Sequence, residues 1–131
     1  MAKAGKIYVR GNMIYQNDIG AGIHVIDNSV PAAAHRIAFI EVAGATEIAM
    51  KGNSLFTNNY MDIVEIDISN PAAPVEKTRV RDAFYTNDNN FPYVWQAPPS
   101  GAGYYLCPQY YTDSVVIDWV KDSVRANCYQ Y

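Results

Sequence analysis

Three aspartates recur at the same point of a repeated apolar motif, and their carboxylates are the first groups that suggest chemistry. Asp27 and Asp67 each end such a motif, and Asp118 ends a shorter version of it. Carboxylates that occur once per repeat would meet on one rim of a repeat protein, where oxygen ligands suit Ca²⁺, which takes roughly six to eight of them. The alternative is that each aspartate caps its own turn. We favour the capping role, and we expect no cofactor and no metal site, with Ca²⁺ the one ion to consider.

The residues after two of these aspartates agree with a role in turns. An Asp-x-Ser-x-Pro pattern begins at Asp27 and again at Asp67. Short Asp and Ser side chains accept hydrogen bonds from nearby backbone N–H groups, and proline restricts φ, so the pattern is typical of a tight turn. The residues predicted to cap the two turns are Asp27, Ser29, Asp67 and Ser69.

No set of groups for nucleophilic catalysis can be assembled from the local sequence. The two histidines, His24 and His35, are not spaced for a zinc site, and neither lies in a Ser/His/Asp or Cys/His motif. His24 occupies an apolar strand position, where we expect a satisfied interior side chain. We therefore predict that the chain is not an enzyme, although the fold class alone does not decide the chemistry.

Aromatic residues in the last third of the chain are the main candidates for recognition. Tyr and Trp combine a large contact area with a polar tip and are enriched in protein interfaces. Two alternatives are that these rings pack internally over the open side of the second repeat, or that they stack on a glycan. The candidates are Tyr93, Trp95, Tyr104, Tyr105, Tyr110 and Tyr111.

These residues belong to a chain with an internal repeat. The apolar strand Ile23–Asp27 recurs 40 residues later as Ile63–Asp67 and, in shortened form, as Val115–Asp118. Each unit contains four short β-like runs separated by Gly, Asn, Asp or Pro, and the apolar residues lack helical spacing. A period near 40 residues with four strands is typical of a β-propeller blade.

We predict an all-β fold of antiparallel propeller-type blades, with about two and a half repeats in a single domain. The expected parts are blade 1 (6–43), blade 2 (44–84), a Pro/Asn/Gly-rich insertion (85–103) and a partial third blade (104–131). A closed propeller needs roughly four or more blades. The open sheets must therefore be covered by the remainder of a longer protein, by other copies of this chain, or by a different partner.

Composition excludes several classes of partner. The chain is 50% hydrophobic and 18% charged, as in globular proteins, and its net charge of −3 comes with scattered Lys and Arg. Nucleic acid is therefore a poor candidate. No apolar run reaches the roughly 20 residues that span a bilayer, and the first residues contain no signal-peptide core. The two cysteines, Cys107 and Cys128, suit either a disulfide in an exported protein or two inert thiols in a cytosolic one.

The repeat resembles the LVIVD-repeat family, which is named for strands like Ile23–Asp27 and Ile63–Asp67 followed by the Asp-x-Ser-x-Pro turn. The pattern Gly-Asn-x-(Ile/Leu)-(Tyr/Phe) at Gly11 and Gly52 belongs to the same repeat. The chain is similar to the N-terminal portion of exported bacterial members, many of them predicted lipoproteins. In those proteins a Cys-…-Trp-…-Cys-Tyr segment follows the first two repeats, and it matches Cys107, Trp119, Cys128 and Tyr129 here.

The resemblance implies a β-propeller outside the cytoplasm, in the periplasm or at the cell surface, with a disulfide between Cys107 and Cys128. It supplies no catalytic residues. We therefore expect a non-enzymatic scaffold for protein–protein interaction, which binds itself or the rest of a longer parent protein. The alternatives are a structural subunit of an extracellular assembly built through open blade edges and, third, a glycan-binding or enzymatic propeller.

Overall fold

The computed structural model describes residues 1–84, 93–94, 115–116 and 120. The chain divides into two compact units, residues 1–86 and 87–131. The described part is built from strands, with one short 3₁₀ helix, η1 (Pro31–Ala33). No helix in these described residues has the length and apolar character needed to cross a membrane.

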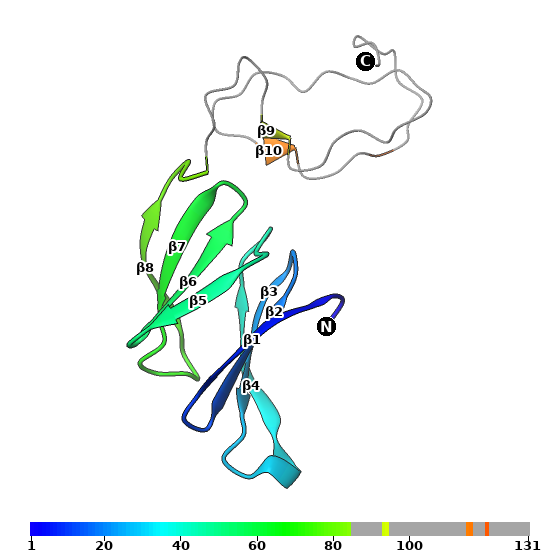
Figure 1. Cartoon of the computed structure of the whole chain (residues 1–131), viewed down its shortest axis with the longest axis vertical. Helices are drawn as coiled ribbons and strands as arrows, with labels where there is room; N and C mark the ends of the chain where they lie inside the picture. The colour runs from blue at the N-terminus through cyan, green and yellow to red at the C-terminus, as the bar shows by residue number, and fades with distance from the viewer. Residues whose placement is uncertain (85–92, 95–114, 117–119, 121–131) are drawn as a thin grey trace. The chain divides into compact units, whose positions relative to one another are not determined.

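The first sheet contains four antiparallel strands whose order in space is their order in the chain (Figure 1). The strands are β1 (Ala4–Arg10), β2 (Met13–Asp18), β3 (Gly22–Asp27) and β4 (His35–Glu41). The sequence pattern predicts a loop from Asn17 onward, but Asn17 and Asp18 belong to β2. They extend the ladder because they pair with Ile23 and Gly22 of β3.

The second sheet repeats this arrangement (Figure 1). Its strands are β5 (Ile48–Lys51), β6 (Ser54–Asn59), β7 (Asp62–Asp67) and β8 (Val75–Val80). Both sheets have a register shift at the same place, between Val25 and Ile26 in the first sheet and between Glu65 and Ile66 in the second. The predicted all-β fold of propeller-like, unclosed blades is confirmed.

The hairpin turns depend on backbone conformations that the sequence already indicates. Gly11 and Gly52 stand at the tips of the β1–β2 and β5–β6 hairpins with φ of 55° and 58°. A side chain is disfavoured at positive φ, so glycine is suited to these tips. The two hairpins are therefore equivalent in both sequence and conformation.

One hydrophobic core joins the two sheets. The first sheet contributes Tyr15, Ile23 and Val25, whose side chains are fully buried. The second sheet and the segments next to it contribute Ile48, Leu55, Val64, Ile66 and Ile68, together with Val42 and Ala45 from the connection between the sheets. We call the two faces that meet in this core the inner faces.

Polar contacts also link the sheets. Lys6 of β1 forms an ion pair with Glu47 just before β5, and Arg10 donates a hydrogen bond to Asn53 in the β5–β6 turn. The first strands of the two sheets therefore lie close together, as the first strands of neighbouring propeller blades do.

In residues 87–131 the described strands are β9 (Tyr93–Val94) and β10 (Val115–Val116). They pair in parallel, with Val115 opposite Tyr93 and Val116 opposite Val94.

Candidate functional site

The outer face of the first sheet is apolar and exposed. Residues paired across neighbouring strands share a face of a sheet, so the register places two rows of side chains on this face. One row contains Ile7, Gln16, His24 and Phe39, and the other contains Val9, Ile14, Ile26 and Arg36. We call these eight residues the Val9 face.

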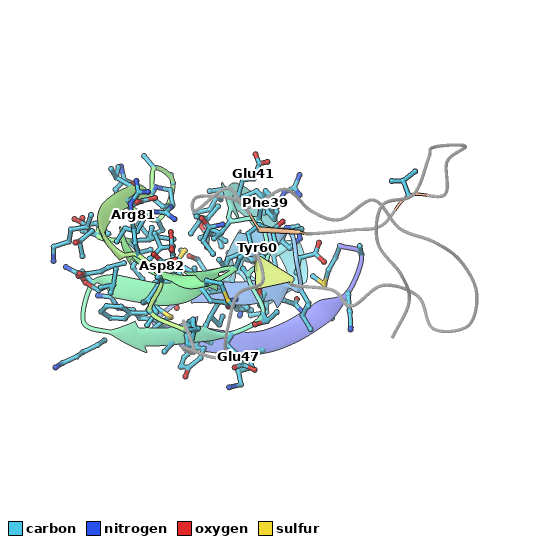
Figure 2. All side chains as sticks on the ribbon, turned by 90° about the horizontal axis from the view of Figure 1, so that it is seen from above. Phe39, Glu41, Glu47, Tyr60, Arg81 and Asp82 are labelled. Atoms are coloured by element: carbon cyan, nitrogen blue, oxygen red, sulfur yellow. The ribbon has the colours of Figure 1, made fainter. Side chains whose placement is uncertain are left out.

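Several large side chains of the Val9 face are open to solvent. Val9 is 66% exposed, Ile7 is 56% exposed, and Phe39, labelled in Figure 2, is 40% exposed. Single exposed apolar residues are ordinary, but a continuous apolar face marks an interaction site. Ile14 and Ile26 extend the apolar area between the strands that carry these exposed residues.

A buried polar pair lies within this face. The Nε2 atom of His24 is 3.3 Å from Oδ2 of Asp18, and both residues are buried. The Nη1 atom of Arg36 lies 3.4 Å from Nδ1 of His24. Because a guanidinium group can only donate, this geometry assigns Nδ1 as the acceptor and Nε2–H as the donor to Asp18. The imidazole is thereby held in place, and its ring packs against Phe39 with the centroids 4.8 Å apart.

Asp18 also fastens the start of the chain to the first sheet. Its Oδ1 accepts hydrogen bonds from the backbone N–H groups of Ala2 and Lys3, at 2.9 and 2.8 Å. The bond from Lys3 is the main reason that the pKa of Asp18 lies below its usual value, and the bond from His24 lowers it further. The Asp18–His24 pair is thus occupied by contacts within the protein, and its role is to support the Val9 face.

The outer face of the second sheet is less apolar. The register places Ala49, Phe56, Glu65 and Thr78 in one row, and Ile63 lies beside Val80 in the next. We call these six residues the Phe56 face. Val80 is 56% exposed. This face therefore mixes apolar side chains with polar ones, and its next row contains Ser54, Asp67 and Val75.

The carboxylate of Glu65 is held by two donors. Its Oε1 accepts a hydrogen bond from Ser54 Oγ at 2.6 Å and lies 2.9 Å from Lys77 Nζ. The bond from Ser54, followed by that from Lys77, lowers the pKa of Glu65 below its usual value. Glu65 therefore stays ionised at neutral pH.

The two aspartates that end the repeated motif bond to their own turns. Asp27 Oδ1 accepts from Ser29 N at 2.8 Å and from Ser29 Oγ at 2.5 Å, and Asp67 Oδ1 accepts from Ser69 N at 2.8 Å. These bonds lower the pKa of both aspartates, with the side chain of Ser29 the largest cause for Asp27 and the backbone of Ser69 for Asp67. Within the described residues, no three acidic, Cys or His side chains form a metal-binding group.

The remaining sequence candidates fall in the last part of the chain. Tyr93 begins β9. The other aromatic candidates, the third repeated aspartate and both cysteines lie outside the described residues: Trp95, Tyr104, Tyr105, Tyr110, Tyr111, Asp118, Cys107 and Cys128.

The polar and aromatic residues of the sequence do not indicate the Val9 face. Ile7 and Val9 are ordinary strand residues when the first unit is considered alone. The signal lies in the repeat, because the residues 41 positions later, Ile48 and Met50, belong to or pack against the core. A residue whose repeat equivalent is in the core, but whose own face no described element covers, is a candidate for an exposed apolar surface.

Comparison with protein families adds one finding. The model of the LVIVD repeat matches residues 44–82, a segment that runs from Gly44 through all of the second sheet. The comparison with curated proteins gave no match, and the comparison with solved structures gave none either. Residues 44–82 are thus an LVIVD repeat, and the predicted resemblance of this chain to the LVIVD-repeat family is confirmed there.

Proposed function

We propose that this chain is a non-enzymatic protein-interaction module whose principal binding surface is the Val9 face. The observation that carries the proposal is the gathering of exposed apolar side chains, Ile7, Val9 and Phe39, on one side of a regular sheet. Burying such side chains against another protein is favourable by about 25 cal/mol per Å² of apolar surface. A sheet face of this kind suits a protein partner because sheets bury their apolar faces against other elements of secondary structure.

The polar residues of the Val9 face support recognition of a protein. Gln16 and Arg36 stand among the apolar side chains, and Arg36 is anchored toward His24. Arginine is enriched in protein interfaces, because its guanidinium group offers several donors in a fixed geometry. The face therefore combines an apolar area with a positioned cation.

We also propose that the module acts outside the cytoplasm, in the periplasm or at the cell surface, as a scaffold. This part rests on the family resemblance, in which exported members carry the same repeat and a paired-cysteine segment. A structural subunit of a larger assembly is the second candidate, and the same exposed face favours it.

Site-specific photocrosslinking tests the binding role. p-Benzoylphenylalanine is introduced in place of Val9 in the full chain, which is then illuminated in the cells that produce it. The matched control carries the same group in place of Val30, which is 61% exposed but lies in the turn before η1. We expect protein adducts from position 9, and their loss when Phe39→Asp is added. Equal adduct formation from both positions, or none from position 9, would overturn the proposal.

A further inference from the structure

We infer that the Val9 face of one copy of this chain docks on the Phe56 face of a second copy, in a head-to-tail arrangement. The inference rests on the proposed function, because it names the partner of the same surface. It is carried by the equivalence of the two sheets and by an interface already present within the chain.

The positions of the Val9 face correspond one to one with those of the inner face of the second sheet, and four of the eight carry a large apolar side chain in both. Both faces consist of two rows across four strands, with equivalent partners in the register. The apolar residues Ile7, Val9, Ile14 and Ile26 stand where the second sheet has Ile48, Met50, Leu55 and Ile66. Of the second set, Ile48, Leu55 and Ile66 are at most 3% exposed, and Met50 packs against the same core. The Val9 face therefore has the composition of a face that this fold buries.

The Phe56 face matches the inner face of the first sheet in the same way. Ala49, Phe56, Ile63 and Val80 stand where the first sheet has Tyr8, Tyr15, Ile23 and Ile40. Tyr15 and Ile23 are fully buried, and Ile40 packs against the core they form. Three of these four positions on the Phe56 face thus carry a large apolar side chain. At the other two positions of the face, Glu65 and Thr78 stand where the first sheet has Val25 and Ala38.

The interface between the inner faces provides a template for the contact between copies. Inside the chain, the inner face of the first sheet meets the inner face of the second. The Phe56 face is equivalent to the inner face of the first sheet, and the Val9 face is equivalent to the inner face of the second. Placing the Phe56 face of one copy on the Val9 face of another repeats the internal packing and continues the same array of blades.

The internal core also favours head-to-tail contact over contact between identical faces. In that core the inner face of the first sheet packs on the inner face of the second. Two Val9 faces, or two Phe56 faces, would not reproduce this packing, because both partners would then be equivalent to the same inner face.

Head-to-tail contacts produce a ring when the rotation closes. We therefore expect a closed ring of copies.

Two substitutions block opposite ends of the array. Val9→Asp places a charge in the Val9 face, and Val80→Asp places one in the Phe56 face. Val30→Asp is the matched control, because it introduces the same charge at an exposed valine outside both faces. Sedimentation velocity and native mass spectrometry on the full chain should show a closed oligomer for the unmodified chain and for Val30→Asp. Both blocking variants should be monomers with cooperative thermal unfolding.

Mixing the two blocking variants separates head-to-tail contact from the alternatives. The Val80→Asp variant retains an intact Val9 face, and the Val9→Asp variant retains an intact Phe56 face, so the mixture should form a one-to-one dimer. Heterodimer formation also shows that both variants are folded. A monomeric unmodified chain, or a mixture without heterodimer, would overturn the inference. Photocrosslinks from position 9 to a different protein would overturn it too, but would leave the proposed function standing.

Discussion

Asn17 and Asn58 stand at the same position of the two sheets, yet only Asn58 has partners for its side-chain amide among the described residues. Asn58 Oδ1 accepts hydrogen bonds from Thr46 N at 2.8 Å and Glu47 N at 3.2 Å, and Nδ2 donates to Gly44 O at 2.8 Å. Asn17 is fully buried, and neither Oδ1 nor Nδ2 has a partner in this part of the chain. Asn58 therefore organises the connection between the sheets, whereas Asn17 makes no equivalent bonds within the described residues.

The two asparagines should differ in their contribution to stability. Asn58→Ala leaves one buried and two partly buried backbone groups without their partner, which we expect to cost about 2–3 kcal/mol of unfolding free energy. Asn17→Ala removes no such bond within the described residues. Its loss of packing is offset because two unpartnered polar atoms leave the interior, so it should cost at most about 1 kcal/mol. Urea unfolding of both variants measures the difference, and equal losses would contradict the assignment.

Gly44 should tolerate a side chain less well than Gly11. Both have positive φ, at 74° and 55°, so alanine at either costs about 1 kcal/mol. A Cβ atom on Gly44 would lie 2.4 Å from the ring of Tyr60, whereas nothing lies within 4 Å of one on Gly11. We expect Gly44→Ala to destabilise the chain by a further 1–3 kcal/mol or so, as in overpacked cores.

A double-mutant cycle isolates the contact between Gly44 and Tyr60. Gly44→Ala is combined with Tyr60→Ser, and both single variants are measured beside it in thermal or urea unfolding. If the ring causes the clash, the double variant should be more stable than the sum of the single losses implies. Additive losses would show that the penalty at Gly44 comes from the backbone alone.

Asp62 should contribute to the loss of stability in acid. Burial raises its pKa, but hydrogen bonds from the Arg79 side chain and from Asp82 N outweigh burial, so the pKa lies below its usual value. A carboxyl group with a lowered pKa in the folded state stabilises the fold above its unfolded pKa, which is about 3.9. That contribution is lost as the pH falls through the folded pKa.

Two variants distinguish titration of Asp62 from the loss of a partner of Arg79. Asp62→Asn should lower stability at pH 7 and flatten its decline below about pH 4. Asn59→Ala removes another acceptor of Arg79, at 2.6 Å, without removing a titrating group, so its stability should decline in acid as steeply as that of the unmodified chain. Chemical denaturation from pH 2 to 7 makes the comparison. An unaltered acid decline in Asp62→Asn would refute the assignment.

Cys107 and Cys128 should form a disulfide when the protein is produced in an oxidising compartment. This prediction rests on the family resemblance, because both residues lie outside the described part of the structure. The bond would close a loop of roughly 20 residues and stabilise the fold by about 3 kcal/mol. Thiol titration of denatured, unreduced chain should find no free thiol. Two free thiols would refute both the bond and the extracytoplasmic location that goes with it.

Much of the blade architecture was predictable because it depends on local patterns. Gly11 and Gly52 indicate hairpin tips because glycine adopts positive φ readily. The strands Ile23–Asp27 and Ile63–Asp67 are indicated by the repeated motif. The boundary at Asn17 was not predictable in this way. Asn and Asp favour turns in isolation, and only pairing with β3 keeps Asn17 and Asp18 in the strand.

The interaction surface was decided by tertiary structure. Sequence alone determined that Ile7, Val9 and Ile14 are strand residues and that they correspond to Ile48, Met50 and Leu55. It did not determine which set is buried, because the two sets have the same apolar character. Burial depends on what packs against each face. The second sheet's set lies against the first sheet, and Ile7 and Val9 remain exposed because no described element covers them.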